Sequence, residues 1–477
     1  MPVITGQEYV ERIDRLNSEI WFNGKRVKGN VSDHPAFKGA IQSQAALYDM
    51  QHKTDLSGLL TYQSPKTGSR IGTSYLMPKT KDDLAKRRKM TQEWARINAG
   101  MLGRSPDYMN TVLMTFAASA TILDGQENCF PDRLVTFYEK AREKDLCFTH
   151  TFIEPQVNRA SFYFEESDEP IAAKIIAEND EGIIVKGARL LATKGGITDE
   201  VLVFSPGGIT DNASAFAFSV PSNAKGLKFL CRESFAGGES EFDYPLSSRF
   251  EEMDSVVVFD NVLIPWDRVF FYKNMMVANT FRSKSAFLPF TLHQVVSRQV
   301  VKVEFLLGLA QSIVKTINIG EYQNVRENVA EIITALETMR ALLIKSEVNA
   351  SIDKFGLMRP ELAPLQVCIS TFPKIYPRLS EIIQLLGSSG MITIPTEADF
   401  SSAIRDDLNQ YLQSKTKDAE ARVKLFRLAW DLTMSAFGTR QTQYERFFFG
   451  NQIILTSDLY MRYEKDKYVD WINEFLS

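Results

Sequence analysis

The stretch "GRSPDYMN" at residues 103–110 sets an arginine and a tyrosine on either side of a helix start. Ser105 is a favourable N-cap residue and Pro106 suits the first helical position. Tyr108 then lies in the first turn, and Arg104 directly precedes the cap. Backbone amides, the helix dipole and a guanidinium together favour an anion such as a phenolate, a carboxylate or a peroxide. The same residues also describe a plain helix start, so this motif alone leaves both interpretations open.

A second polar segment, "FTHTFIEPQVNR" at residues 148–159, lies where a helical pattern gives way to a β pattern. His150 is in an extended part that Pro155 keeps from becoming helix. A lone histidine at such a junction is more often structural than catalytic, yet pockets form at domain interfaces. The segment ends with amide and guanidinium groups suited to a flavin ring or a phosphate, on Gln156, Asn158 and Arg159.

Two glycine-containing segments offer further binding groups. In "LLATKGGITDE" a strand ends at Thr193, and the glycine turn after it could bring amides close to a ring. "FGTRQTQYE", from Phe437, brings glycine and arginine together in either a diphosphate site or a helix-end loop. The strand and loop "DNVLIPWDRV" at residues 260–269 is interpreted as structural. No GxGxxG follows a strand, so a flavin used here would be reduced by something other than this chain.

Composition narrows the class of protein. A chain of 477 residues is expected to form two or three packed units. The net charge of -4, spread without long runs, argues against a nucleic-acid partner. No apolar run approaches the roughly 18 residues of a membrane span and no signal peptide is evident, so a cytoplasmic location and no membrane are expected. The four cysteines and four histidines show no metal-ligand spacing, which favours free thiols and no metal.

The elements that must position these residues fall into three blocks, which predict an α+β fold. Residues 1–145 carry helical patterns, beginning with the capping box "TGQE" at residues 5–8. Residues 146–274 contain short β-rich runs such as "ASFYFEE" and "SVVVFDNVLIP", typical of a barrel or sandwich. Residues 275–477 return to helical periodicity and predict a helix bundle with faces free for another subunit. One buried stripe is expected to comprise Val303, Leu306, Leu307, Ala310, Val314 and Ile317.

Taken in order, these motifs resemble the oxygenase component of two-component FAD-dependent 4-hydroxyphenylacetate 3-monooxygenases. The resemblance spans nearly the whole chain and also includes "ITGQEYV", "HPAF" and "DYPLSSRFEEMD". It implies an acyl-CoA dehydrogenase-like fold and a homotetramer. It also implies that an NAD(P)H-dependent flavin reductase supplies reduced FAD, which reacts with dioxygen to a flavin hydroperoxide. A small phenolic substrate, 4-hydroxyphenylacetate, would then be hydroxylated ortho to its hydroxyl group, giving 3,4-dihydroxyphenylacetate.

The resemblance assigns roles to individual residues. Arg104, Tyr108 and His150 would surround the phenol oxygen and the hydroperoxide as catalytic and substrate-binding residues. Ser205 and Pro206, expected to follow the same strand pair as Thr193, would hold the substrate's tail. The implied FAD contacts are His150, Thr151, Phe152, Gln156, Val157, Asn158, Arg159, Thr193 and the loop of Gly438, Thr439, Arg440 and Gln441, the loop reaching across a subunit boundary.

Two departures from the family pattern leave the para substituent open. Residues 234–248 match no pattern for one substrate, and Gln441 stands where the family carries histidine. Phenol and chlorophenol hydroxylases therefore remain alternatives. The related 4-hydroxybutyryl-CoA dehydratases need clustered cysteine and histidine ligands that this chain lacks. An acyl-CoA dehydrogenase needs a glutamate base and a CoA channel that no segment indicates. A non-catalytic protein of this fold would be favoured if no flavin were bound.

Overall fold

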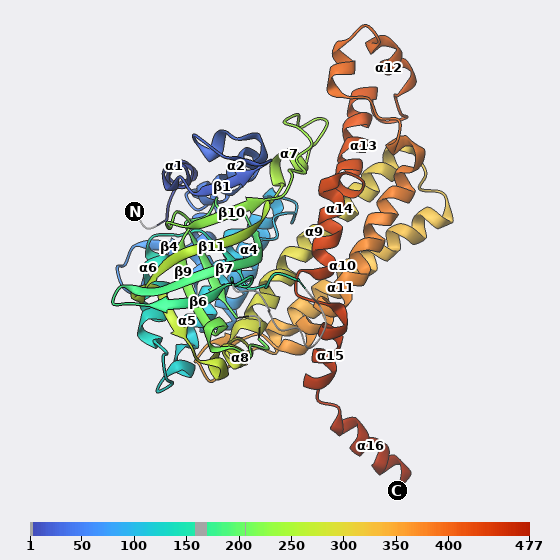
Figure 1. Ribbon diagram of the computed structural model, residues 1–477. Coiled ribbons are helices and arrows are strands. Elements are labelled where there is room, and N and C mark those ends of the chain that lie inside the picture. The colour runs from blue at the N-terminus through green and yellow to red at the C-terminus, as the bar shows by residue number, and fades with distance from the viewer. Residues whose placement is uncertain (1–2, 158–168, 206) are drawn as a thin grey trace.

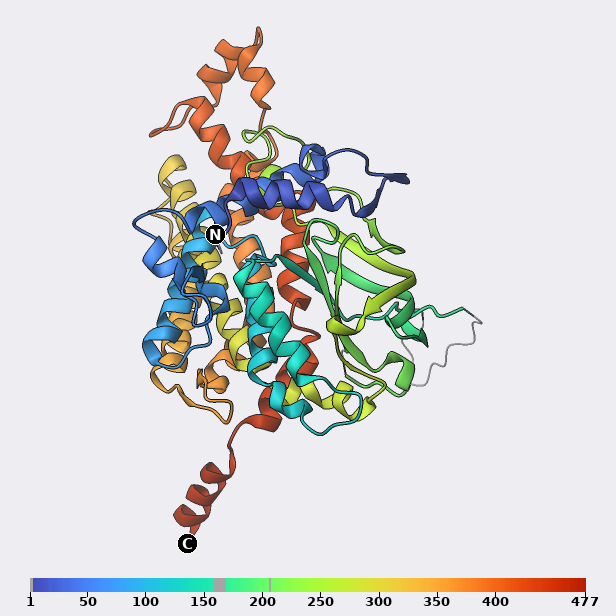
Figure 2. The ribbon, with the colours of Figure 1, turned by 90° about the vertical axis from the view of Figure 1, so that its left-hand side faces the viewer.

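The computed structural model describes residues 3–157, 169–205 and 207–477. Figures 1 and 2 show the strands gathered on one side of the molecule and the long helices on the other. The predicted strand "ASFYFEE" lies outside the described residues, as do Asn158, Arg159 and Pro206. Within the described part of the chain, no helix combines the length and hydropathy that a membrane span needs.

The first third is mainly helical. Its helices are α1 (Gly6–Leu16), α2 (Pro35–Met50), α3 (Ser57–Leu60), α4 (Lys81–Ile97), α5 (Pro106–Ala118) and α6 (Pro131–Glu143). The capping box of Thr5 and Glu8 is confirmed. The prediction missed four short strands, β1 (Glu19–Phe22), β2 (Lys25–Arg26), β3 (Thr61–Gln63) and β4 (Arg70–Gly72). They are too short to show a period, and β1 exists because it pairs in parallel with a strand some 200 residues later.

Strands β5 to β12, together with β1 and β2, form two sheets whose packing confirms the predicted sandwich. Outside them β3 pairs with β4, and β13 (Ser351–Ile352) pairs with β14 (Met358–Arg359), a short hairpin that the sequence did not predict. The larger sheet has the order β2-β1-β10-β11-β7-β6 and the smaller β12-β9-β8-β5. Their bounds are β5 (Phe148–Thr151), β6 (Lys174–Glu178), β7 (Gly182–Thr193), β8 (Glu200–Phe204), β9 (Phe216–Pro221), β10 (Leu227–Cys231), β11 (Asp254–Pro265) and β12 (Val269–Tyr272). Apolar side chains of both sheets share one core, including Val185 of β7 and Val203 of β8.

This topology corrects one expectation about the site. Thr193 ends β7 in the larger sheet, whereas Ser205 follows β8 in the smaller one, so the two residues do not follow the same strand pair. The chain changes sheets between residues 194 and 199, and alternation of apolar residues cannot reveal such a crossing. The domain boundaries at residues 145 and 274 stay predictions. Strand β1 belongs to the predicted N-terminal helical domain by sequence, yet it pairs within the larger sheet of the β domain.

The last block is a bundle around α9. Its long helices are α9 (Phe287–Ile317), α10 (Gln323–Val348), α11 (Leu362–Gly387), α13 (Ala419–Thr433) and α14 (Ala436–Phe447). Four members of the predicted stripe of α9 are buried, whereas Leu307 and Ile317 are half-buried. Shorter helices are α7 (Ser247–Phe250), α8 (Met275–Lys284), α12 (Arg405–Tyr411), α15 (Gln452–Arg462) and α16 (Asp466–Leu476). Figure 1 shows α16 at the end of the chain, apart from the bundle.

A buried charge cluster locks α14 to α9. The Glu445 carboxylate of α14 accepts hydrogen bonds from Arg298 at 2.8 Å, Lys302 at 2.9 Å and Gln299 at 3.0 Å, all on α9. Arg298 also donates to the carbonyl of Gly100, at 2.8 Å, so the segment before α5 is held by the same cluster. The relative positions of α14, α9 and the segment before α5 therefore depend on the Glu445 carboxylate.

The pKa values of this cluster follow from burial and pairing. Burial alone would raise the pKa of Glu445, but Arg298 and Lys302 outweigh it and lower the pKa to about 2. Burial lowers the pKa of Lys302 to about 8, although Glu445 opposes the shift. Because the pKa of Glu445 is depressed on folding, its contribution to stability is complete above its ordinary pKa of 4.5 and is lost as the pH falls toward 2.

Replacing Glu445 by glutamine should strongly destabilise the fold, because it leaves Arg298 and Lys302 buried without a counter-charge. We expect the free energy of unfolding at neutral pH to fall by about 3–5 kcal/mol. The control is Glu337→Gln, which breaks an exposed pair with Arg340 and should cost less than about 1 kcal/mol. Denaturant unfolding measures both, and similar small losses would contradict the role given to Glu445.

Candidate active site

The start of α5 lies where the sequence predicts it. The helix begins at Pro106, with Ser105 at the N-cap and Tyr108 in the first turn. Ser105 does not cap through its side chain, however. Its hydroxyl donates to the Asp107 carboxylate at 2.5 Å, and Asp107 in turn accepts from Thr91 and Gln294. Buried neighbours, invisible in the local motif, therefore determine how this helix start is stabilised.

The amides before the helix are already occupied. Gly103 and Arg104 donate their backbone N–H groups to the two oxygens of the buried Glu252 carboxylate, at 2.9 and 2.8 Å. The expectation that free amides at this position would bind a ligand anion is therefore corrected for these two groups. The Arg104 guanidinium can still bind an anion.

Aromatic rings surround that guanidinium. The Arg104 Cζ atom lies 4.1 Å from the ring centre of Phe448, 4.6 Å from that of Tyr108 and 5.6 Å from that of Tyr444. Its Nη1 donates a hydrogen bond to the Tyr444 hydroxyl at 2.8 Å. The charge is buried among π faces, which stabilise a cation without neutralising it.

His150 of β5 lies beside Tyr108, with 5.9 Å between the ring centres. Its Nδ1 is 2.9 Å from the Met109 sulfur. A thioether has no proton to donate, so this contact favours the tautomer with the proton on Nδ1 and a lone pair on Nε2. Burial lowers the pKa of His150 well below its ordinary value, and the charges of Arg104 and Arg282 lower it further. The imidazole is therefore neutral, and its Nε2 can accept a hydrogen bond.

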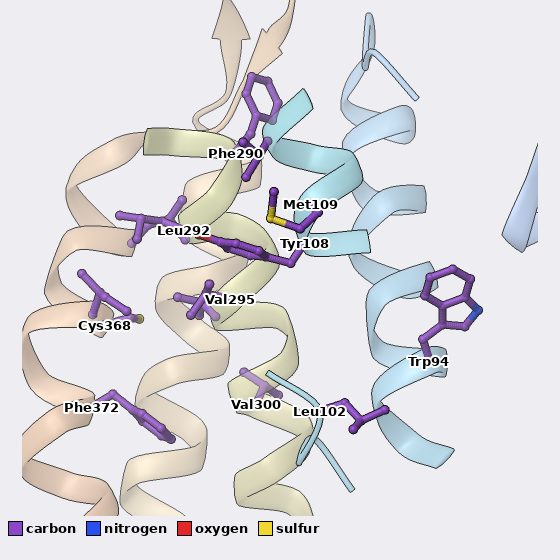
Figure 3. Close-up of a cluster of buried hydrophobic side chains, with 14 of the residues drawn as sticks. Trp94, Leu102, Tyr108, Met109, Phe290, Leu292, Val295, Val300, Cys368 and Phe372 are labelled. Carbon is purple, nitrogen blue, oxygen red and sulfur yellow. The ribbon is translucent and has the colours of Figure 1, made fainter. Parts of the chain in front are cut away.

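Tyr108 complements His150. Burial raises the pKa of its hydroxyl, although Arg104 and Arg282 oppose the shift, so Tyr108 stays protonated. Figure 3 shows Tyr108 and Met109 together on α5, in one cluster with Leu292 and Val295 of α9. A cation, a protonated hydroxyl and a neutral imidazole thus come together, a set of groups that can bind a phenol oxygen and stabilise it as phenolate.

An aromatic wall extends from His150. The rings of His150, Phe152 and Phe204 are nearly parallel, with 5.3 Å and 10° between the first two and 5.5 Å and 14° between the last two. Ser205 follows Phe204, and its buried hydroxyl has no hydrogen-bond partner among residues 3–157, 169–205 and 207–477. Arg282 of α8 lies over Phe152, at 5.9 Å from the ring centre. The wall is apolar, with polar groups at its end.

Asp254 joins two of the segments expected to bind FAD. It accepts a hydrogen bond from Thr193, its partner in the β7–β11 register, at 2.8 Å. Arg440 binds the same carboxylate through two nitrogens, each at 2.8 Å. Burial would raise the pKa of Asp254, but Arg440 outweighs it and holds the pKa well below its ordinary range. The Nη1 of Arg440 is buried and forms no hydrogen bond within the described residues.

Residues 438–441 do not form the expected loop. They belong to the first turns of α14, because Ser435 starts the helix ahead of them. The amides of Gly438 and Thr439 both donate to Ser435, at 3.0 and 2.9 Å, so they are not free for a diphosphate. Gln441 is fully buried, where it accepts a hydrogen bond from Lys302 at 2.7 Å. Arg440 has a buried nitrogen, Nη1, that forms no hydrogen bond within the described residues and lies 4.0 Å from the Glu252 carboxylate.

The glycine turn after Thr193 serves packing within the chain. The amides of Lys194 and Gly195 donate to Met253 and Ala192. A Cβ atom on Gly195 would lie 2.3 Å from the Ser255 hydroxyl, so glycine is needed there for strand packing. Of the other expected contacts, Thr151 is buried and donates to Leu190, whereas Gln156 and Val157 are exposed. Their roles toward FAD stay predictions.

The chain that forms this site is similar to known proteins along nearly its whole length. Models of the 4-hydroxyphenylacetate 3-hydroxylase N-terminal and C-terminal regions match residues 5–271 and 278–477. The chain belongs to this family. A probable 4-hydroxyphenylacetate 3-monooxygenase of Bacillus subtilis (strain 168) is 57% identical over 100% of this chain and 99% of its own length. The oxygenase component of a 4-hydroxyphenylacetate 3-monooxygenase, solved with FAD and 4-hydroxyphenylacetate, is 41% identical, with a TM-score of 0.94 over 99% of this chain and 98% of that chain.

A more distant family member and a more distant structural neighbour are also similar to this chain. A 4-nitrophenol 2-monooxygenase oxygenase component of a Rhodococcus species is 32% identical over 94% of this chain and 86% of its own length. Glutaryl-coenzyme A dehydrogenase, at 12% identity, has a TM-score of 0.51 over 82% of this chain and 83% of that chain. The predicted family and the acyl-CoA dehydrogenase-like fold are thus confirmed.

Gly103 provides a test of the packing around Arg104. A Cβ atom at this position would lie 2.2 Å from the hydroxyl oxygen of Tyr444 and 2.3 Å from the adjoining ring carbon. Gly103→Ala must therefore displace Tyr444 and should lower the free energy of unfolding by about 1–3 kcal/mol. Gly308→Ala, at an exposed position of α9 with open space, should raise it by about 0.5–1 kcal/mol. Thermal or denaturant unfolding distinguishes these opposite signs, and a neutral Gly103→Ala would argue against the close contact.

Proposed function

We propose that this chain is the oxygenase component of a two-component FAD-dependent 4-hydroxyphenylacetate 3-monooxygenase. The observation that carries the proposal is the meeting of Arg104, Tyr108 and His150 in one buried group. These residues come from a loop, a helix and a strand. Burial raises the pKa of the Tyr108 hydroxyl and lowers that of His150, so that both neutral groups can form hydrogen bonds with a phenol oxygen. Family membership and 57% identity to a probable enzyme of this name support the same reaction.

The chain's own residues supply the acid–base part of the chemistry. The neutral His150 can accept a hydrogen bond from the phenol hydroxyl at Nε2, and Tyr108 can donate a hydrogen bond to the same oxygen. The Arg104 charge stabilises phenolate character on that oxygen, which raises the nucleophilicity of the ring carbon ortho to it. The wall of Phe152 and Phe204 excludes water from the site, so that activated oxygen reaches the ring before it is lost.

The residues present fit a flavin in part. Reduced FAD, delivered by a separate reductase and combined with dioxygen, would supply the oxygen atom that is transferred. The buried Nη1 of Arg440 forms no hydrogen bond within the described residues and could donate one to the cofactor, although the Glu252 carboxylate lies 4.0 Å away and already balances part of its charge. Thr193 lies beside Arg440 through Asp254. Phe152, stacked on His150, offers a face for the ring system. The amides of residues 438 and 439 are not part of this proposal, because Ser435 already occupies them.

The proposed assembly is a homotetramer. The helices α15 and α16 support it, because they expose large apolar side chains that include Ile453, Trp471 and Phe475. In Figures 1 and 2, α16 extends away from its own bundle, in a position suited to contact another subunit. Whether residues 438–441 reach a neighbour's cofactor stays a prediction, as does the cytoplasmic location.

The reconstituted reaction tests the function directly. With a flavin reductase, NADH, FAD and dioxygen, the protein should convert 4-hydroxyphenylacetate to 3,4-dihydroxyphenylacetate, with the product identified by mass. A panel that adds phenol, a chlorophenol and 4-nitrophenol tests the alternatives, one of which is a substrate named for a family member. Turnover of simple phenols without the acid would change the substrate and keep the reaction class. Absence of any bound flavin would instead favour a non-catalytic protein.

Variants of the central residues should uncouple the reaction. His150→Ala removes the hydrogen-bond acceptor for the phenol hydroxyl and should slow hydroxylation roughly 10²-fold while NADH oxidation continues and hydrogen peroxide accumulates. Arg104→Ala should act in the same direction, because the phenolate loses its counter-charge. His52→Ala, at an exposed histidine, is the matched control. Product and peroxide are measured together, and unchanged coupling in both variants would remove these residues from the site.

A further inference from the structure

Two stripes of side chains run along α14. Arg440, Tyr444 and Phe448 follow one another at intervals of four residues and therefore share a face. They lie next to Asp254 and Arg104. Gln441 and Glu445 occupy the adjacent stripe and bind α9. One stripe anchors the helix, and the other faces the candidate active site.

Tyr444 is the member of this face that contacts Arg104 most specifically. Its hydroxyl accepts the hydrogen bond of 2.8 Å from Arg104 Nη1, the one hydrogen bond of this guanidinium to the described residues. Its ring stacks on Phe448 at 4.7 Å, and both rings flank the same cation. Gly103 leaves the space that the Tyr444 ring occupies, as the 2.2 Å approach of a hypothetical Cβ shows.

We propose that Tyr444 is a positioning residue for Arg104, holding the guanidinium so that its charge faces the phenol oxygen; this rests on the proposed function. The physical reason is the neutrality of the acceptor. A carboxylate in its place would pair with Arg104, cancel the charge and compete with the bound phenolate. The Glu252 carboxylate instead has both oxygens on the backbone amides of residues 103 and 104.

The Tyr444 hydroxyl is protonated and neutral, as a positioning role requires. Burial raises its pKa well above the ordinary value, and the opposing charges of Arg104 and Arg298 do not cancel that rise. The hydroxyl therefore stays protonated and neutral. Since Glu445, the next residue, is fixed by α9, the position of the Tyr444 oxygen is fixed as well, and so is the direction in which it holds Arg104.

The test uses the full-length protein with FAD and 4-nitrophenol as the probe, because the phenolate form of this phenol absorbs visible light. Wild-type protein should bind the phenolate and lower the apparent pKa of the bound probe. Tyr444→Phe keeps the ring and removes the hydroxyl, and it should weaken phenolate binding roughly 3- to 10-fold, raising that apparent pKa by half to one unit. Arg104→Met should abolish the preference for phenolate.

The decisive measurement combines these variants. If Tyr444 acts through Arg104, adding Tyr444→Phe to Arg104→Met causes no further change in the apparent pKa of the probe. Gly103→Ala, which displaces the tyrosine without deleting it, should reproduce the shift of Tyr444→Phe. The matched control is Tyr376→Phe, at a buried tyrosine of α11 that contacts Lys302 and not Arg104, and it should leave the probe unchanged.

The possible failures are distinct. If the probe responds to Arg104→Met but not to Tyr444→Phe or Gly103→Ala, the inference is overturned and the proposed function stands. An equal effect of Tyr444→Phe with and without Arg104 also overturns it, since Tyr444 would then act independently. If wild-type protein binds no phenol, the proposed function and the inference fail together.

Discussion

The Glu445 carboxylate is the constraint on which the geometry of the site depends. It is buried with two cations of α9, so α14 cannot shift along α9 without separating charges in a medium where separation is costly. Apolar packing alone would tolerate small displacements of a helix. Because Arg298 also binds the carbonyl of Gly100, the segment leading to Arg104 is set by the same cluster. The bundle and the first third of the chain are thereby held in one register.

Electrostatic complementarity follows from this arrangement. Two buried carboxylates lie near Arg104 and Arg440, and each is already engaged by the protein. The Glu252 carboxylate accepts hydrogen bonds from two backbone amides. The Asp254 carboxylate accepts hydrogen bonds from the Thr193 hydroxyl and from the Arg440 guanidinium. The Arg104 charge therefore meets π faces and a neutral hydroxyl. A buried positive charge that is stabilised but not neutralised raises the affinity for an anion far more than an exposed one would.

Local signals in the sequence predicted the local structure well. The start of α5, the strand that carries His150 and the end of β7 at Thr193 were all readable, because caps and periodicity depend on neighbouring residues. The distant residues that contact Arg104 could not be predicted from the sequence. Tyr444 reaches Arg104 across 340 positions and Glu252 reaches it across 148, and no pattern near either residue indicates the contact.

The two incorrect predictions about the site also arose from contacts between segments that local sequence patterns do not show. Residues 438–441 resemble a glycine loop, but Ser435 caps the helix ahead of them and uses their amides. Thr193 and Ser205 are close in sequence, yet they belong to different sheets because the chain crosses between them. Pairing between distant segments decided each case, and pairing of that kind is the part of a fold that a single sequence specifies only through the whole core.

The two ends of the proposed substrate site differ in how firmly they are held. Arg104 and Tyr108 are tied to the charge cluster of the bundle, whereas the segment after Ser205 is held by Asn279 of α8, which exchanges hydrogen bonds of 2.7 and 2.9 Å with the backbone of Ile209. Under the proposed function, changes near Asn279 would act on the segment expected to hold the substrate's tail and leave the groups around the phenol oxygen in place. Such a division would suit a family with members named for 4-hydroxyphenylacetate and for 4-nitrophenol, two phenols that share the hydroxyl end and differ at the other.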